Sequence, residues 1–166
     1  SHADVGDKAN DSLRVNGSEL RCKVIGEGGN LGMTQSARIE FSVHGGQCFT
    51  DAIDNAAGVN CSDLEVNIKI LLDKLVSKGD LTPKQRNVWL QKMTDEVSAL
   101  VLHNNYRQAQ SISLAYKQGY QNIEEYRRLI DSQEEKGKLN RALEFIPTDE
   151  VITERKNAEL GLVRPC

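Results

Sequence analysis

Three polar side chains in the first part of the chain have the chemistry to bind a ligand. Two of them, Asn30 and Asn55, carry a carboxamide, which offers hydrogen-bond donors and an acceptor. Two such groups at adjacent places in a fold can hold another carboxamide or a ribose hydroxyl. Asparagine is equally common in turns, where it bonds to nearby backbone groups. The residue types alone therefore leave both roles open for Asn30 and Asn55.

Ser62 is the third candidate, and its hydroxyl also has two uses. The pattern Ser62-x-x-Glu65 is a capping box, which predicts that a helix begins at Ser62. A hydroxyl that bonds to the first amides of a helix has little capacity left for a substrate. A helix start nevertheless attracts anions, so a carboxylate close to Ser62 would gain from both the hydroxyl and the amides.

Other kinds of site do not match the spacing of the residues. A dinucleotide-binding loop needs glycines at its first, third and sixth positions, but Gly26 and Gly28 are followed by Leu31 at the sixth. Several acidic residues fit no metal-binding motif and are expected to be ion-paired or solvated. These are Asp51, Asp54, Asp63 and Glu65. No metal ligand and no catalytic residue is assigned.

The cysteines have neither the spacing of a zinc site nor that of a disulfide framework. A chain of 166 residues buries enough surface to fold without either. We therefore expect all of them to be free and mostly buried. The four cysteines are Cys22, Cys48, Cys61 and Cys166.

The elements that position Asn30 and Asn55 are predicted from the apolar pattern. Residues 20–25 and 47–53 each read as a short strand, and each is followed by a loop that contains one of the two asparagines. Residues 34–44 fit either a helix or another strand. We favour the helix, because a helical crossover lets the flanking strands pair in parallel. Ligands bind at the carboxyl ends of such strands, where both loops lie.

The rest of the chain is predicted to be helical. The helix that begins at Ser62 is expected to end at Gly79, and Thr82-Pro83-Lys84-Gln85 combines a cap, a proline and a glutamine in the pattern of another helix start. That helix is expected to break or bend at Asn104 and Asn105. Amphipathic patterns predict further helices at residues 3–13, 106–119, 122–137 and 139–146, and one that is capped by Thr148.

Composition divides the chain into two unlike parts. Nine of its 13 glycines lie at or before Gly58. We expect residues 1–61 to form an α/β piece and residues 62–166 a helical bundle, which makes the chain mostly α overall. The net charge of −3 gives no basic surface for nucleic acid, and no apolar run is long enough to span a membrane. Because no signal peptide is recognisable, we expect a cytoplasmic location.

The two predicted loops carry a resemblance to a known family. The run Lys-Val-Ile-Gly-Glu-Gly-Gly-Asn at residues 23–30, followed by Asp-Asn-Ala-Ala-Gly-Val at residues 54–59 and by Ser62, resembles the end of the nucleotide-binding domain of glutamate dehydrogenases. Residues 4–72 are similar to the large bacterial NAD-specific enzymes, which carry near-identical strings around Gly-Asp-Lys-Ala-Asn-Asp. Two later strings, Met-Thr-Asp-Glu-Val and Asn-Tyr-Arg-Gln, extend the resemblance over most of the chain.

The resemblance implies oxidative deamination of L-glutamate to 2-oxoglutarate and ammonia, with hydride transfer to NAD. It implies that Asn30 and Asn55 contact the nicotinamide side of the cofactor and that Ser62 helps to bind a substrate carboxylate. It also implies that residues 1–61 are the C-terminal part of a Rossmann-like NAD-binding domain. Ala57 departs from the glycine that is common at this position in the small hexameric enzymes.

The resemblance further implies that the sequence is one piece of a longer enzyme. The catalytic lysine and aspartate of the family and its pyrophosphate loop would belong to sequence before Ser1. We therefore expect the isolated chain to be inactive, its partner to be the rest of the same polypeptide, and the full-length enzyme to be a homo-oligomer. Two alternatives stay open: a free-standing helical interaction or regulatory module with a vestigial α/β start, and a related dehydrogenase that acts on leucine or phenylalanine.

Overall fold

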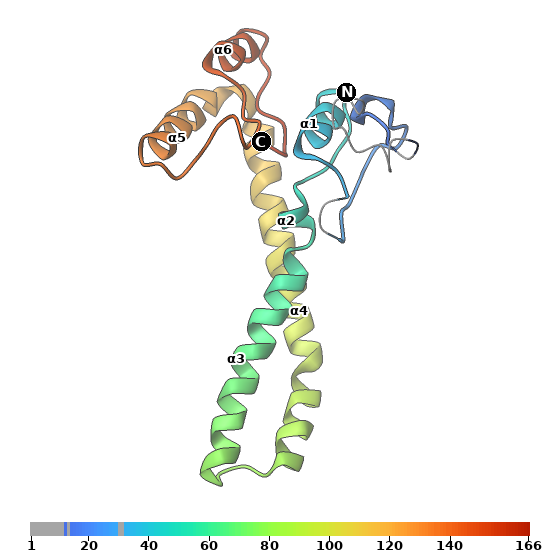
Figure 1. Ribbon diagram of the computed structural model, residues 1–166, viewed down its shortest axis with the longest axis vertical. Helices are drawn as coiled ribbons and strands as arrows, with labels where there is room; N and C mark the ends of the chain where they lie inside the picture. The colour runs from blue at the N-terminus through green and yellow to red at the C-terminus, as the bar shows by residue number, and fades with distance from the viewer. Residues whose placement is uncertain (1–11, 13, 30–31) are drawn as a thin grey trace. The chain divides into compact units, whose positions relative to one another are not determined.

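The computed structural model describes residue 12, residues 14–29 and residues 32–166 of the chain. These residues form helices that are joined by turns and loops (Figure 1). The helix predicted at residues 3–13 lies outside the described residues except for residue 12, and Asn30 also lies outside them. None of the helices in the described part is long and apolar enough to cross a lipid bilayer.

The expected sheet is absent from the part of the chain that the structure describes. The two predicted strands meet only at an isolated parallel bridge between Val24 and Gln47, where Ile25 N donates to Gln47 O at 2.9 Å and Gln47 N donates to Lys23 O at 2.9 Å. A short strand pair without a packed face is at best marginally stable in water, and Val24 keeps 66% of its surface exposed. The prediction of a Rossmann-like strand-helix-strand piece was therefore wrong.

The segment between the two halves of this bridge is the helix that we favoured at residues 34–44. Helix α1 (Gln35–Val43) follows Thr34, whose Oγ1 accepts a hydrogen bond from Ala37 N at 3.2 Å. It ends at His44, and Gly45 then takes a left-handed φ of 91°, which suits glycine. The helical interpretation is confirmed.

Two glycines let other backbone segments pack closely against α1. The 3-10 helix η3 (Gly17–Glu19) lies so near to α1 that a Cβ atom on Gly17 would overlap with Ala37 O. A Cβ atom on Gly46 would overlap in the same way with the ring of Phe41, which is 2% exposed. Glycine is therefore the residue that allows α1 to bury its aromatic side chain here.

The chain divides into two compact units, which are described separately. The first joins Ser1–Asp51 to Ser111–Cys166. Besides η3 and α1 it contains η4 (Gly119–Asn122), α5 (Ile123–Glu135) and α6 (Asp149–Asn157). The domain boundary that we expect between residues 61 and 62 stays a prediction.

The C-terminal part of the first unit has a small apolar core between α5 and α6. The starts of both helices were predicted correctly, and Thr148 Oγ1 accepts a hydrogen bond from Val151 N at 3.5 Å at the start of α6. The fully packed core residues are Ile123, Ile130 and Ile152, and the partly buried residues against them are Leu139, Ile146 and Leu162.

The helix predicted at residues 139–146 was wrong, because these residues form a loop with turns. Asn140 Oδ1 accepts a hydrogen bond from Leu143 N at 3.0 Å, and Phe145 has a left-handed φ of 56°. Pro147 disfavours a helical conformation at the residue before it. So short a segment also gains too few hydrogen bonds to offset the cost of starting a helix.

The second unit, Ala52–Gln110, consists mainly of α3 (Ala56–Lys78) and most of α4 (Pro83–Gln118). Helix α4 begins as predicted, because Thr82 Oγ1 accepts a hydrogen bond from Gln85 N at 3.2 Å and Thr82 N donates to Gln85 Oε1 at 2.9 Å. Each side chain thus binds a backbone amide that would otherwise lack a partner.

The break expected at Asn104 and Asn105 was wrong, because α4 continues through both residues. Asn105 Nδ2 donates to Ile53 O at 3.5 Å, so this side chain bonds to another segment and not to its own turn. Leu72 and Val101 are the buried apolar residues of this unit. Many of its large apolar side chains are exposed: Val59, Val66, Ile70, Leu71, Val88, Trp89, Leu100, Leu102 and Tyr106.

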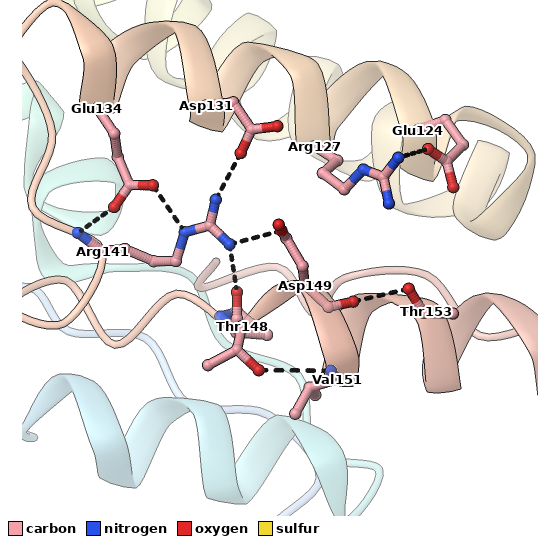
Figure 2. Close-up of polar contacts among 10 residues, drawn as sticks. Glu124, Arg127, Asp131, Glu134, Arg141, Thr148, Asp149, Val151 and Thr153 are labelled. Atoms are coloured by element: carbon pink, nitrogen blue, oxygen red, sulfur yellow. Dashed lines mark hydrogen bonds and ion pairs between the residues drawn. The ribbon is translucent and has the colours of Figure 1, made fainter.

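Arg141 connects three segments of the first unit (Figure 2). Its guanidinium pairs with Asp131 at 2.7 Å and Glu134 at 3.1 Å, both on α5, and with Asp149 at 2.8 Å at the start of α6. Its Nη1 also donates to Pro147 O at 3.4 Å. The hydrogen bond to Asp149 is the main reason that the pKa of Arg141 is raised. One side chain therefore holds α5, the following loop and α6 together.

We expect Arg141→Met to lower the free energy of unfolding by about 1–3 kcal/mol, because three carboxylates lose their hydrogen bonds to a charged partner. Arg127→Met is the matched control. Arg127 pairs with Glu124 at 2.8 Å one turn away on α5 (Figure 2), so its loss should cost less than about 0.5 kcal/mol. Urea unfolding of the chain, followed by circular dichroism, measures both. Equal losses would contradict the linking role of Arg141.

Candidate functional site

Asn55 lies at the junction of two helices. It follows α2 (Asp51–Asp54) and is the residue directly before α3, with φ −100° and ψ 13°. Its backbone oxygen accepts a hydrogen bond from Gly58 N at 3.1 Å. A Cβ atom on Gly58 would lie 2.9 Å from Asn55 Oδ1, so the absence of a side chain at Gly58 gives the carboxamide its space. Asn55 is half-buried.

Ser62 is not a helix cap, and the prediction that a helix begins there was wrong. Helix α3 begins six residues earlier, at Ala56, since Ala56 and Ala57 are strong helix formers that extend it toward Asn55. Only the first four amides of a helix lack a partner within it, and Ser62 lies beyond them. The amides of a helix start are therefore not available beside Ser62, and its exposed side chain offers a hydroxyl alone.

Asn55 and Ser62 nevertheless share one face of α3. Ser62 follows Asn55 by seven positions. In a regular α-helix this spacing is nearly two full turns, which aligns the two residues to within about 20° and separates them by about 10 Å along the axis. Gly58 and Val59 lie between them on the same face. The face therefore presents a carboxamide and a hydroxyl with Gly58 and the exposed Val59 between them, whereas Asn30 lies outside the described residues.

The most buried polar pair of the described chain was not foreseen. Glu27 is 6% exposed and Arg38 is 4% exposed. Arg38 Nε donates to Glu27 Oε2 at 2.5 Å, and Arg38 Nη2 donates to Glu27 Oε1 at 3.0 Å. Glu27 belongs to the predicted glycine loop and Arg38 to α1. This bidentate ion pair therefore fastens the start of the loop to the helix.

Glu27 also connects the two ends of its own loop. Its Oε1 accepts a hydrogen bond from Met33 N at 2.8 Å, and a Cβ atom on Gly32 would lie 3.2 Å from the same oxygen. The carboxylate thus lies against the segment that returns to α1. An alanine at residue 32 would press on this buried oxygen, so glycine suits this position.

The remaining edge of the Arg38 guanidinium faces the start of α2. Arg38 Nη2 lies 3.3 Å from Asp51 Oδ1, and Arg38 Nη1 donates to Gln35 Oε1 at 3.3 Å. The hydrogen bond to Glu27 is the main reason that the pKa of Arg38 is raised, although burial acts in the opposite direction. The guanidinium therefore stays charged. One sequence signal pointed to it, because Arg38 lies one helical turn before the buried Phe41 and so falls on the inner face of α1.

The other side chains considered from sequence have ordinary roles. Asp51 is ion-paired with Arg38, as expected, and Glu65 pairs with Lys69 one turn along α3. No cluster of three or more potential metal ligands occurs among the described residues. All four cysteines are free as predicted, but the expectation that most are buried was wrong, because Cys48 alone is buried.

Comparison with known proteins connects this geometry to a family. The family model described as the catalytic domain of bacterial NAD-glutamate dehydrogenase matches residues 1–115. The chain belongs to this family. The match includes Asn55 and Ser62 as well as the buried pair of Glu27 and Arg38. It confirms the family that the glycine-rich strings indicated.

Three curated relatives of the glutamate dehydrogenase family extend the similarity to nearly the whole chain. The NAD-specific glutamate dehydrogenase of Pseudomonas aeruginosa is 63% identical over 164 residues, which are 99% of this chain. Those of Halomonas elongata and Mycobacterium tuberculosis are 57% and 46% identical over 98% and 99% of the chain. In each case the chain spans 10% of the length of the relative.

The position of Ser62 inside α3 predicts a small effect of its removal on stability. Ser62→Ala should change the free energy of unfolding by less than about 0.5 kcal/mol, because alanine is a good helix former and no cap is lost. Thr82→Ala is the matched control on a real cap and should cost about 1 kcal/mol. Urea unfolding of the two variants tests this, and a loss for Ser62→Ala as large as that for Thr82→Ala would contradict the position of Ser62.

Proposed function

We propose that this chain is a segment of a NAD-specific glutamate dehydrogenase, which converts L-glutamate, NAD and water to 2-oxoglutarate, ammonia and NADH. The observation that carries the proposal is the family match over residues 1–115. It is supported by the high identity to the Pseudomonas aeruginosa enzyme along 99% of the chain. The rest of the same polypeptide would supply the catalytic lysine and aspartate.

The residues of this chain would bind and orient the two reactants. Asn55 offers the donors and the acceptor that a carboxamide or a ribose hydroxyl needs, and Gly58 leaves space beside it. We assign Asn55 to the nicotinamide side of the cofactor, and the same role to Asn30 from its sequence. When bound, NAD accepts the hydride that leaves the α-carbon of glutamate.

Ser62 would contact the substrate. Its hydroxyl donates one hydrogen bond, and a charged acceptor such as a carboxylate makes that bond stronger. Asn55 directly precedes α3 and Ser62 lies about two turns further along it, so a ligand group at each of them can be oriented by the same helix. We assign Ser62 to a carboxylate of L-glutamate or 2-oxoglutarate. The full-length enzyme would act in the cytoplasm as a homo-oligomer.

A segment exchange tests the proposed function directly. This chain should support glutamate-dependent NADH formation when it replaces the 63% identical segment in the Pseudomonas aeruginosa enzyme. The isolated chain should give none, because it would hold only part of the pocket. Both activities are measured by absorbance of NADH. An inactive but folded chimera, or an active isolated chain, would contradict the proposal.

The two assigned residues should affect different substrates in this chimera. Asn55→Ala should raise the KM for NAD about threefold to tenfold, as expected for the loss of a neutral hydrogen bond, and leave the KM for glutamate unchanged. Ser62→Ala should raise the KM for glutamate by about tenfold or more, because its partner is charged. Steady-state kinetics with each substrate varied in turn measures both constants.

Matched controls for these two substitutions lie further along α3. Asn67 donates to Asp63 O at 2.9 Å, and Ser77 donates to Lys74 O at 2.9 Å, so both bond within their own helix. Asn67→Ala and Ser77→Ala should leave both KM values unchanged. If Asn55→Ala and Ser62→Ala behave like these controls, the binding assignments are wrong, even if the chimera is active.

A further inference from the structure

The burial of the ion pair of Arg38 and Glu27 is by itself weak evidence of a role in stability. Taking two charges out of water costs free energy that their attraction does not always offset, and a buried pair can often be replaced by apolar residues without loss of stability. Both side chains are almost fully buried. What an apolar pair cannot reproduce is the geometry, because a guanidinium holds its partners at set directions and distances.

The Arg38 guanidinium contacts two other segments as well as its own helix. Two of its nitrogens bind the two oxygens of Glu27, at 2.5 and 3.0 Å, and Nη2 also lies 3.3 Å from Asp51 Oδ1. A third nitrogen, Nη1, donates to Gln35 within α1. Arg38 therefore ties the start of the glycine loop and the start of α2 to one rigid helix.

One of the segments that Arg38 holds leads directly to Asn55, the described residue that is assigned to the cofactor. Glu27 Oε1 also accepts the hydrogen bond of 2.8 Å from Met33 N, so Arg38 is linked through Glu27 to the residue just before Thr34 and α1. Asp51 is the first residue of α2, and Asn55 follows the last residue of that helix. A shift of the guanidinium would therefore be passed to the backbone on which these residues are carried.

We infer that Arg38 is a positioning residue for NAD, which acts through Glu27 and Asp51 and touches neither cofactor nor substrate. This inference rests on the proposed function. The buried ion pair holds Glu27, which is bonded to Met33, and the first residue of α2 in place before the cofactor arrives. The cofactor then binds to a preformed backbone, and less of its binding free energy is lost in ordering these segments.

The test uses the chimeric enzyme described above with the substitution Arg38→Lys. Lysine keeps the charge but has one nitrogen in place of the planar fork, so it cannot hold Glu27 and Asp51 in the same geometry. We expect the KM for NAD to rise about tenfold, because only a fraction of the molecules would keep Glu27 and Asp51 in the arrangement that favours binding. The dissociation constant for NADH, measured by fluorescence titration, should rise by a similar factor, whereas the KM for glutamate should change less than about twofold.

A double substitution separates positioning from stability. In Glu27→Met with Arg38→Met the two buried charges are removed together, and the carboxylate of Asp51 that remains is 19% exposed and so in contact with water. The melting temperature should therefore be close to that of the unsubstituted chimera. The weaker binding of NAD and NADH should nevertheless persist. A role in stability alone predicts normal constants for this variant.

Arg141→Lys is the matched control, because Arg141, like Arg38, pairs with more than one carboxylate but holds α5 and α6. It should lower the melting temperature and leave the constants for NAD and NADH unchanged. The inference is overturned if Arg38→Lys binds NADH as the unsubstituted chimera does, or if Arg141→Lys weakens NADH binding equally. An inactive unsubstituted chimera would instead overturn the proposed function.

Discussion

A buried guanidinium needs anionic partners on its edges, and this need organises residues 27–51. Arg38 meets it with the carboxylates of Glu27 and Asp51, which come from the glycine loop and from the start of α2. The described part of this region contains no strand, and Gln47 forms only an isolated β-bridge with Val24. The segments are therefore connected by hydrogen bonds to Arg38 and not by the hydrogen bonds of a sheet. The glycines then matter because they let backbone and carboxylate approach α1 closely.

A second arginine that binds several carboxylates joins segments in the C-terminal part of the first unit. Arg141 binds Asp131, Glu134 and Asp149 and joins α5 to α6 beside a core of three isoleucines. Its side chain is 14% exposed and that of Arg38 is 5% exposed, so Arg141 is the better solvated of the two. Solvation weakens ion pairs, so we attribute mainly local stability to Arg141 and precise geometry to Arg38.

Most helix starts that are signalled within a few residues were read correctly from the sequence. Thr34 lies at the start of the helix that we favoured, and Thr82 and Thr148 were recognised as caps, since a cap needs only its own side chain and the next amides. Ser62 matched the same pattern but failed, because the residues before it are helix formers that carry α3 back to Asn55. The strands at residues 20–25 and 47–53 failed because strand pairing depends on neighbours that local patterns do not contain.

By itself the sequence determined the family, through glycine-rich strings long enough to be specific, and most helix starts, through caps that involve adjacent residues. It also placed Asn55 and Ser62 among the candidate ligands. The tertiary structure alone decided that both lie on one helical face and that Glu27, Arg38 and Asp51 form one buried network. Glu27 and Arg38 are eleven positions apart, and Arg38 and Asp51 thirteen. Contacts over such separations depend on how the chain turns between the partners, which no local pattern of residue types records.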